Sequence, residues 1–334
     1  MIDILAVVVS YGETAQLNHL VDDLTRIPEC RVVLVENKVG AHHEALPDSA
    51  TVLGGHGNVG YGTAVNIAVA HARRTAPTPD WLLVVNSDVS LPADTRDAIA
   101  PLLASASGHA EVVGFAVRTS NGGRGRSSAV LPSVRTNAFT AVRGESAAVE
   151  RWPHQRYPVG AFFAIRTETF VRLGGFDPAY WMYYEETDLF ARLRANGGRI
   201  AWADESWPVV HEGGGTTGRA GLLHVELGRS AAIYARAHRR SLGTSWPLVH
   251  AAQLAALAVR KVVTGRTEDA ARAARIAHGL ARGLADPRWE PAATSPWRAT
   301  PAADRAHVGA LHPGHEVVRP RSGAEADMPV GVAP

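Results

Sequence analysis

The feature that most constrains the fold is a run of five apolar residues that ends in an acidic turn. Residues 81–85 read Trp-Leu-Leu-Val-Val, and Asn86, Ser87 and Asp88 follow directly. A strand that is apolar at every position is typical of a parallel sheet covered on both faces. Ligands bind outside the carboxyl ends of such strands, so Asp88 could hold a metal or a phosphate there. The alternative role for a single aspartate is a turn or helix cap.

Short apolar runs and segments of helical periodicity alternate from Ile4 to Ala203. Strands are predicted at 4–9, 31–35, 51–53, 81–85, 111–117, 159–165 and 200–203, and helices at 14–27, 63–73, 93–104, 167–173 and 187–195. This order predicts an α/β fold with a mostly parallel central sheet flanked by helices. Residues 119–156 are rich in Ser, Gly and Arg with little periodicity, which predicts a long irregular excursion on the surface.

The composition divides the chain into three parts. Residues 1–219 form the α/β domain, and residues 220–286 form a helical C-terminal extension with helices at 225–237, 247–263 and 270–284. Residues 287–334 are rich in Pro, Ala and Arg without periodicity, which predicts a disordered tail.

Composition also excludes several classes of protein. The 334 residues are 46% hydrophobic, which is enough for a large core, and no segment has the ~20 successive apolar residues of a membrane span. The N-terminus enters a strand without a basic region or cleavage site, so we expect a cytoplasmic protein. A single cysteine, Cys30, excludes an internal disulfide and a cysteine-based zinc site. The net charge of +2 without a concentrated basic patch predicts no nucleic-acid partner.

A glycine-rich segment, Gly54–Gly62, lies between a predicted strand and a predicted helix. It contains a G-x-G-x-x-G pattern from Gly55 to Gly60, which is found in dinucleotide-binding turns. The pattern follows the third strand rather than the first, and no strand-end acid follows about twenty residues later, which argues against a nicotinamide or flavin site. Glycine-rich backbone at a helix start still suits a diphosphate.

A second acidic cluster comprises Glu185, Glu186 and Asp188, directly after four aromatic residues between 180 and 184. Mutual repulsion raises the pKa of at least one such acid. Alternatively, the acids stabilise a helix N-terminus and Asp188 pairs with Arg192 one turn later. The aromatic residues suit the faces of a sugar ring, or pack in the core. Further on, His211 follows an apolar pair and is either a structural histidine or, with Asp88, part of a site for Mn²⁺ or Mg²⁺.

These motifs, taken in order, resemble the family 2 glycosyltransferases, which have the nucleotide-diphospho-sugar transferase (GT-A) fold. The motifs that carry the resemblance are 7–11, 36–37, 57–62 with Asn66, 86–88, 160–161, 174–177, 185–189 and His211. The branch looks like the bacterial rhamnosyl- and galactofuranosyltransferases, whose helical C-terminal extension is similar to residues 224–284.

The resemblance implies a nucleotide-sugar site with dTDP-rhamnose or a UDP-sugar as donor. Its donor-binding residues would be Ser10, Tyr11, Glu36, Asn58, Gly60, Asn66, Asn86 and Asp88. Residues 86–88 stand where the family has Asp-x-Asp, so that Asp88 and His211 would bind the divalent metal on the diphosphate. Asn86 replaces the first acid of that motif, which predicts weaker metal binding.

The resemblance also implies a direct displacement that inverts the sugar. Glu186 takes the position of the catalytic base, where the family more often has Asp, and Glu185 and Asp188 would be supporting or acceptor-binding acids. Trp181 and Gly160 would bind the acceptor, which is a glycan or a polyprenyl-linked glycan of cell-surface polysaccharide synthesis. A sugar-1-phosphate nucleotidyltransferase is a weaker alternative, because residues 10–13 lack the glycine/arginine-rich loop with a lysine that it needs. A catalytically weak nucleotide-sugar-binding or scaffold protein of the same fold is the other alternative.

The segment Leu248–Val263 is apolar around much of its circumference and includes Arg260 and Lys261. It is too short to span a bilayer but could lie on an anionic membrane surface, which would place the protein peripherally on the inner face of the plasma membrane. The alternative is that these helices pack on the catalytic domain. The sequence does not indicate an oligomeric state.

Overall fold

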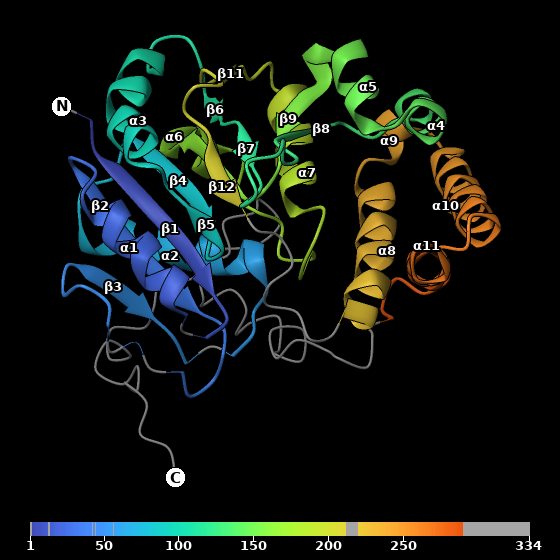
Figure 1. Ribbon diagram of the computed structural model, residues 1–334, viewed down its shortest axis with the longest axis horizontal. Helices are drawn as coiled ribbons and strands as arrows, with labels where there is room; N and C mark the ends of the chain where they lie inside the picture. Colours follow the sequence, from blue (N-terminus) through green and yellow to red (C-terminus); the bar gives the residue numbers. More distant parts are fainter. Residues whose placement is uncertain are drawn as a thin grey trace.

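The computed structural model describes residues 2–12, 14–41, 43, 45–55, 57–211 and 220–289. An α/β domain lies beside a group of helices formed by the C-terminal part of the chain (Figure 1). The predicted fold class, a mostly parallel sheet flanked by helices with a helical C-terminal extension, is confirmed. The tail predicted for residues 287–334 falls almost entirely outside the described residues.

The central sheet has seven strands in the order β11-β6-β10-β4-β1-β2-β3. Their bounds are β1 Ile4–Ser10, β2 Cys30–Glu36, β3 Ala50–Leu53, β4 Trp81–Asn86, β6 Val112–Gly114, β10 Phe162–Arg166 and β11 Ile200–Trp202. Strand β10 runs antiparallel to both of its neighbours, and the other pairs are parallel. The carboxyl ends of β1, β2 and β4 therefore meet at one edge of the sheet.

Helices cover both faces of this sheet. Along β1, Leu5 and Val7 pack on one side, while Ala6 and Val8 pack on the other. The helices on the first side are α2 (Tyr61–Thr75), α6 (Thr167–Arg172) and α7 (Glu185–Ala195), and those on the second are α1 (Ala15–Thr25) and α3 (Ala93–Ala106). Residues Trp81 to Val85 are fully buried, because both faces of β4 contact core side chains as the apolar run predicted.

The prediction of an irregular excursion over residues 119–156 is wrong. The segment contains β8 (Ser128–Val130), α4 (Val134–Arg143), α5 (Glu145–Arg151) and a 3₁₀ turn (Pro153–Gln155), and β8 pairs with β9 (Arg156–Pro158). Helix α4 starts in a capping box in which the Ser133 hydroxyl accepts from the Thr136 amide while the Thr136 hydroxyl accepts from the Ser133 amide. Thr136 is the only buried residue of this helix.

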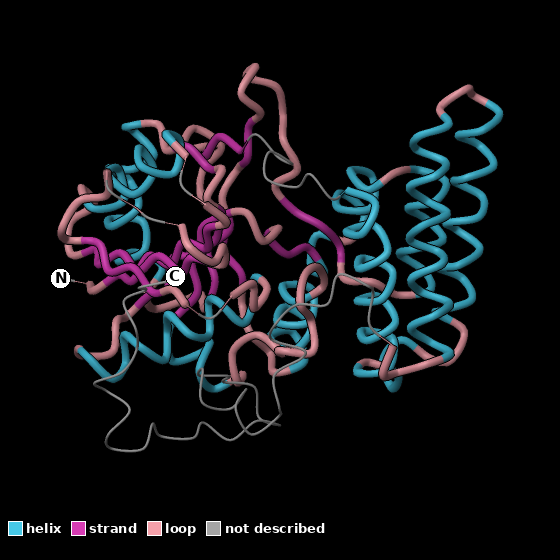
Figure 2. The backbone as a smooth tube through the Cα atoms, turned by 90° about the horizontal axis from the view of Figure 1, so that it is seen from below, coloured by secondary structure: helices cyan, strands magenta, loops and turns pink. Residues whose placement is uncertain are grey.

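The extension consists of α8 (Ala220–Ala237), α9 (Arg239–Leu242), α10 (Trp246–Val263) and α11 (Thr267–Ala285). Helices α8 and α11 touch backbone to backbone: a Cβ on Gly228 would lie 1.9 Å from the Ile276 carbonyl oxygen, and one on Gly279 would lie 2.0 Å from that of Val225. Helices α10 and α11 run side by side at the outer end of the molecule (Figure 2). None of the described helices is long and apolar enough to cross a membrane.

Candidate active site

The structure brings Asp88 and His211 together at the edge of the sheet. After β4 the chain turns into β5 (Val89–Ser90), which pairs antiparallel with β12 (Val209–His211), so that His211 lies opposite Val89. His211 Nε2 lies 3.0 Å from Asp88 Oδ1, and the two side chains are 22% and 19% exposed. Within the described residues, no third His, Cys, Asp or Glu joins them to form a larger cluster. A carboxylate and an imidazole with access to solvent can supply two ligands to a divalent ion.

Glu36, at the end of β2, organises the loop after β1. Its carboxylate accepts hydrogen bonds from the Ser10 hydroxyl at 2.9 Å, the Gly12 amide at 2.9 Å and the Lys38 amide at 2.6 Å. His43 Nε2 lies 2.7 Å from the same carboxylate. Ser10 and Glu36 are only 1% and 4% exposed, so that these two predicted donor-binding residues form the frame of the loop.

Tyr11, in contrast, is 47% exposed beside this frame and is free to meet a ligand. His43 was missed by the sequence reasoning, because no pattern connects an isolated loop histidine to an acid seven positions earlier.

The glycine-rich loop is joined to the aromatic segment before α7. The Asn58 carbonyl accepts from Trp181 Nε1 at 3.2 Å, and the Tyr61 amide donates to the Trp181 carbonyl at 3.1 Å. Gly60 has φ +84°, and a Cβ there would lie 2.1 Å from the Trp181 carbonyl oxygen. Only glycine fits this close contact. Asn58, Gly60 and Trp181 therefore form one unit, although the prediction divided them between donor and acceptor.

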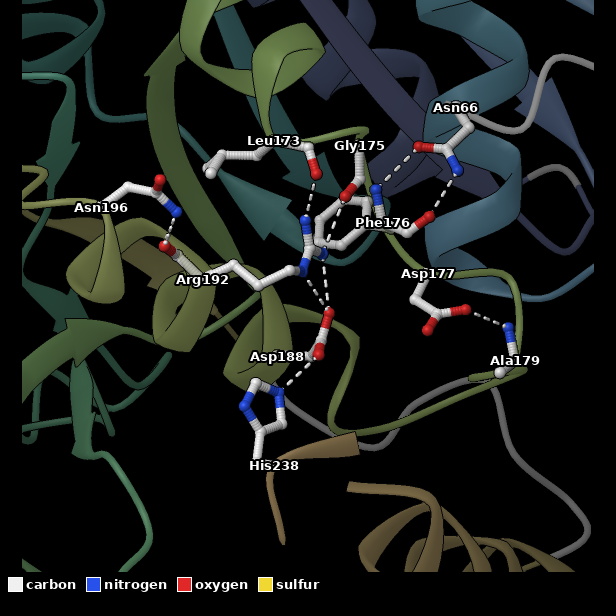
Figure 3. Close-up of polar contacts among 10 residues, drawn as sticks. All are labelled: Asn66, Leu173, Gly175, Phe176, Asp177, Ala179, Asp188, Arg192, Asn196 and His238. Carbon is white, nitrogen blue, oxygen red and sulfur yellow. Dashed lines mark hydrogen bonds and ion pairs between the residues drawn. The ribbon is translucent and has the colours of Figure 1, made fainter. Parts of the chain in front are cut away.

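Asn66, which was predicted to bind the nucleotide, lies in the core of the protein. Its side chain is fully buried in α2. The amide nitrogen donates to the Phe176 carbonyl at 2.8 Å, and the amide oxygen accepts from the Phe176 amide at 3.0 Å (Figure 3). Both polar ends of Asn66 are thus used to hold the loop before α7 against α2.

Glu185 and Glu186 begin helix α7. The two residues before them, Tyr183 and Tyr184, have φ of +67° and +68°, a costly conformation for two tyrosines in succession. Burial raises the pKa of both glutamates. The pKa of Glu185 lies well above its usual value, because the charge of Glu186 raises it in addition to burial. Among the described residues, the buried Glu185 Oε2 has no hydrogen-bond partner.

Tyr61 links these glutamates to the strand-end site. Its hydroxyl donates to the Gly160 carbonyl at 2.9 Å, and the Glu186 side chain lies against Gly160, with Cγ 3.7 Å from where a Cβ would be. Burial raises the pKa of Tyr61, and Glu185, Glu186 and Asp88 raise it further. The charges of the α7 glutamates and of Asp88, which follows β4, therefore all act on one phenol, whose hydroxyl is hydrogen-bonded to the acceptor-binding glycine predicted from the sequence.

Strand β4 is held next to Gly160, because the backbone amide of Asn86 donates to the carbonyl of Ala161 at 2.9 Å. The sequence reasoning missed Tyr61 as a site residue, although it belongs to the glycine-rich motif.

Arg126, from the segment predicted to be irregular, is paired with Glu145 at 2.5 Å, and its side chain is 63% exposed. Partial desolvation lowers its pKa, but Glu145, then Tyr157 and Glu186, raise it. Its positive charge in turn lowers the pKa of Glu186, against the larger effect of burial. No sequence pattern distinguishes Arg126 from the other arginines around it.

Asp188 faces away from this cluster. Burial alone would raise its pKa, but a hydrogen bond from His238 and the charge of Arg192 lower it. His238 Nε2 lies 2.7 Å from one carboxylate oxygen, and Arg192 Nε donates to the other at 2.8 Å (Figure 3). Arg192 also donates to the carbonyls of Leu173 and Gly175 at 2.6 and 2.9 Å. The Asp188 side chain, predicted as a supporting or acceptor-binding acid, is 3% exposed and joins α7 to His238, the residue after α8.

Comparisons with known proteins bear on this site. Residues 145–210 match the model of a family described as the N-terminal domain of galactosyltransferase; this segment includes Trp181, Glu185 and Glu186. The N-acetylglucosaminyl-diphospho-decaprenol L-rhamnosyltransferase of two Mycobacterium tuberculosis strains is 28% identical, over 72% of this chain and 86% of that enzyme.

Two solved structures are similar at lower identity. GalNAc-T7, crystallised with UDP, GalNAc and Mn²⁺, has a TM-score of 0.47 and 13% identity, over 73% of this chain and 52% of that one. Glucosyl-3-phosphoglycerate synthase from M. tuberculosis, in complex with Mn²⁺, UDP-glucose and phosphoglyceric acid, has a TM-score of 0.46 and 14% identity, over 70% of this chain and 79% of that one. The sequence matches confirm the predicted resemblance to rhamnosyltransferase-like glycosyltransferases and the enzyme class, glycosyltransferase.

Proposed function

We propose that this glycosyltransferase moves a sugar, with inversion and with the help of a divalent metal, from a nucleotide-diphosphate donor to a lipid-linked glycan acceptor. The observation that carries the proposal is the pair of Asp88 and His211 at 3.0 Å, together with Glu186 against Gly160, whose carbonyl accepts from the Tyr61 hydroxyl. The relative from M. tuberculosis is named for a rhamnosyl transfer to a diphospho-decaprenol acceptor, which supports dTDP-rhamnose as the donor ahead of a UDP-sugar. A protein with such an acceptor would work in the cytoplasm, at the inner face of the membrane.

Asp88 and His211 are the residues that would hold Mn²⁺ or Mg²⁺. Both are partly exposed, and an oxygen and an imidazole nitrogen 3.0 Å apart form a donor pair of suitable chemistry. When bound, the ion would neutralise the charge that develops on the departing nucleoside diphosphate. The donor's base would lie against Tyr11, whose ring is exposed beside the rigid frame of Ser10 and Glu36.

Glu186 is the proposed general base. Its carboxylate takes the proton of the acceptor hydroxyl as that oxygen bonds to the anomeric carbon of the sugar, while the bond from this carbon to the diphosphate oxygen breaks. Attack opposite to the leaving group inverts the anomeric carbon. Burial raises the pKa of Glu186 and makes its carboxylate a stronger base near neutral pH.

The donor site is tested by thermal unfolding with dTDP, UDP and GDP, each with and without Mn²⁺. We expect one nucleotide to raise the Tm, and to do so more strongly with Mn²⁺. Asp88→Asn and His211→Ala should remove the effect of Mn²⁺, whereas Asp94→Asn, an exposed acid on α3, should retain it. Stabilisation without any hydrolysis or transfer of the nucleotide sugar would favour the scaffold protein, and no stabilisation by any nucleotide would contradict the proposal.

A further inference from the structure

The outer face of α10 has a continuous stripe of apolar side chains. The helix packs inward through Trp246 and Leu254, which are 0% and 6% exposed. The side chains on the other face include Leu248, Val259, Val262 and Val263, which are 74%, 64%, 59% and 80% exposed. Ala252 and Ala255 are exposed between them.

Positions 248, 252, 255, 259 and 262 recur every three or four residues, so they form one stripe along the helix. At 1.5 Å per residue the stripe is about 22 Å long. Within the described structure no other element covers it, and soluble proteins rarely leave such a continuous apolar surface without a partner.

Exposed arginines lie on α10 itself and on the neighbouring helices α4 and α9. Helices α4, α9 and α10 contain no acidic residue, and five of their arginines are exposed: Arg135, Arg143, Arg239, Arg240 and Arg260. Their one lysine, Lys261, is paired with Asp269 at 3.0 Å. Among the described residues, Arg239 and Arg240 have no ion-pair partner, and they line a surface concavity of about 480 Å³ formed by residues 236–241. Only residues 243–245 separate α9 from the first turn of α10.

We propose that the apolar stripe of α10 and the arginines around it dock on an anionic lipid bilayer. The stripe would enter the acyl boundary while the arginines contact lipid phosphates, which is how interfacial helices with an apolar face and a basic rim bind. The excess of unpaired positive charge favours an anionic bilayer over a second copy of this chain, which would place arginines opposite arginines. The inference rests on the proposed function, because binding to a bilayer would bring the enzyme to an acceptor that is held in the membrane by its lipid.

The docking face is connected to the active site by packed side chains. The rings of Trp246 in α10 and Tyr234 in α8 meet edge to face, with their centroids 6.1 Å apart. Tyr234 in turn contacts Tyr184, which directly precedes Glu185. The 2.7 Å contact between His238 and Asp188 ties the residue that follows α8 to α7. A bilayer bound to α10 would therefore hold the start of α7 at a fixed orientation to the membrane (Figure 1).

Vesicle flotation of the full chain tests the inference. We expect binding to phosphatidylcholine vesicles that contain phosphatidylglycerol, weaker binding without the anionic lipid, and weaker binding at high salt. Val259→Glu should lower partitioning about tenfold, because it puts a charge where the acyl boundary would be. Val52→Glu, at an exposed valine of β3 on the opposite side of the molecule, should leave it unchanged. Arg239→Gln and Arg240→Gln should each lower it about fivefold.

Circular dichroism melts show whether each variant is folded, and light scattering gives its oligomeric state. The inference is overturned if the wild-type chain does not bind anionic vesicles, or if the Val259→Glu and Val52→Glu variants bind them equally. It is also overturned if the wild-type chain is a dimer that does not bind vesicles and Val259→Glu converts it to a monomer. Nucleotide-dependent stabilisation, measured on the same samples, reports on the proposed transferase separately, because it needs no membrane.

Discussion

The acids of α7 lie in two regions that differ in their surroundings. Asp188 faces the helical extension, where His238 and Arg192 occupy both carboxylate oxygens and lower its pKa. Glu185 and Glu186 face Tyr61 and Gly160, where burial raises the pKa of both. Residues that are nearly adjacent in the sequence are therefore opposite in electrostatic character.

The difference shows how partners decide the role of a buried acid. A carboxylate whose charge is matched by an arginine and a histidine is stable as an ion and holds elements together. A carboxylate that is buried with little compensation costs stability and is reactive, which is typical of catalytic acids and bases. On this basis Asp188 is a structural acid and Glu186 is the candidate base.

The largest expected effect is on turnover. Glu186→Gln keeps the shape of the side chain but cannot accept a proton, so we expect kcat to fall by ~10²–10⁴. Glu185→Gln is the matched control, with the same change one residue earlier. Initial rates of sugar transfer, measured with both variants at saturating donor, check this.

Turnover of Glu186→Gln within about tenfold of the wild type, with Glu185→Gln inactive, would move the base to Glu185. Loss of donor-dependent stabilisation in Glu186→Gln would instead mean that the substitution disturbs binding rather than chemistry.

The next largest effect is expected on stability, in the region where Asp188 contacts Arg192 and His238. Asp188→Asn removes the charge that Arg192 and His238 share, and leaves a buried guanidinium without its counter-ion. We expect the free energy of unfolding to fall by about 3 kcal/mol. Urea unfolding monitored by tryptophan fluorescence measures it.

Burial would raise the pKa of Asp188, but His238 and Arg192 outweigh it, so the pKa in the folded protein is lowered. The ionised carboxylate therefore stabilises the fold above the unfolded pKa. This stabilisation is lost as the pH falls through the folded pKa. The deficit of Asp188→Asn should therefore shrink in acid. A deficit that is constant with pH, or an inactive variant of unchanged stability, would contradict the structural role.

Much of the fold could be predicted because its strands are continuous apolar runs. The segment Trp81–Val85 is buried on both faces, and such a run has few other stable environments. Helix α4 was missed because it packs on α10 and buries only Thr136, so its sequence shows no run of core residues. The Ser133–Thr136 capping box was present in the sequence and could have indicated its start.

The site was predicted less evenly. The motifs located Asp88 and His211 correctly relative to one another, since strand ends and their order fix where such residues meet. Motifs do not give the direction of a side chain, however, so Asn66 was assigned to a ligand although it bonds to Phe176. Contacts made by Arg126 and His238 depend on how distant segments pack, which no local pattern specifies.

A smaller effect is expected in the pH dependence of the reaction. If Glu186 is the base, kcat should fall as the pH falls through a pKa that lies above the usual value of a glutamate, because burial raises it. Arg126→Gln removes a nearby charge that favours the ionised form, so the acid limb should move to higher pH in that variant. A full pH profile of kcat for both proteins measures the shift, and an unmoved limb would show that Glu186 does not titrate in this range.

The smallest effect is a gain of stability in the same region. Burial, and then the charge of Glu186, raise the pKa of Glu185 in the folded protein above its unfolded value. The contribution of Glu185 to the stability of the fold is therefore fully present at low pH, and it is lost as the pH rises through the folded pKa. Glu185→Gln has no charge to bury and should therefore have a higher Tm than the wild type at alkaline pH, with the difference vanishing in acid. Glu168→Gln, an exposed acid on α6, should show no such trend. A pH-independent difference would mean that Glu185 is compensated in the folded protein, and the contrast between Glu185 and Asp188 would then disappear.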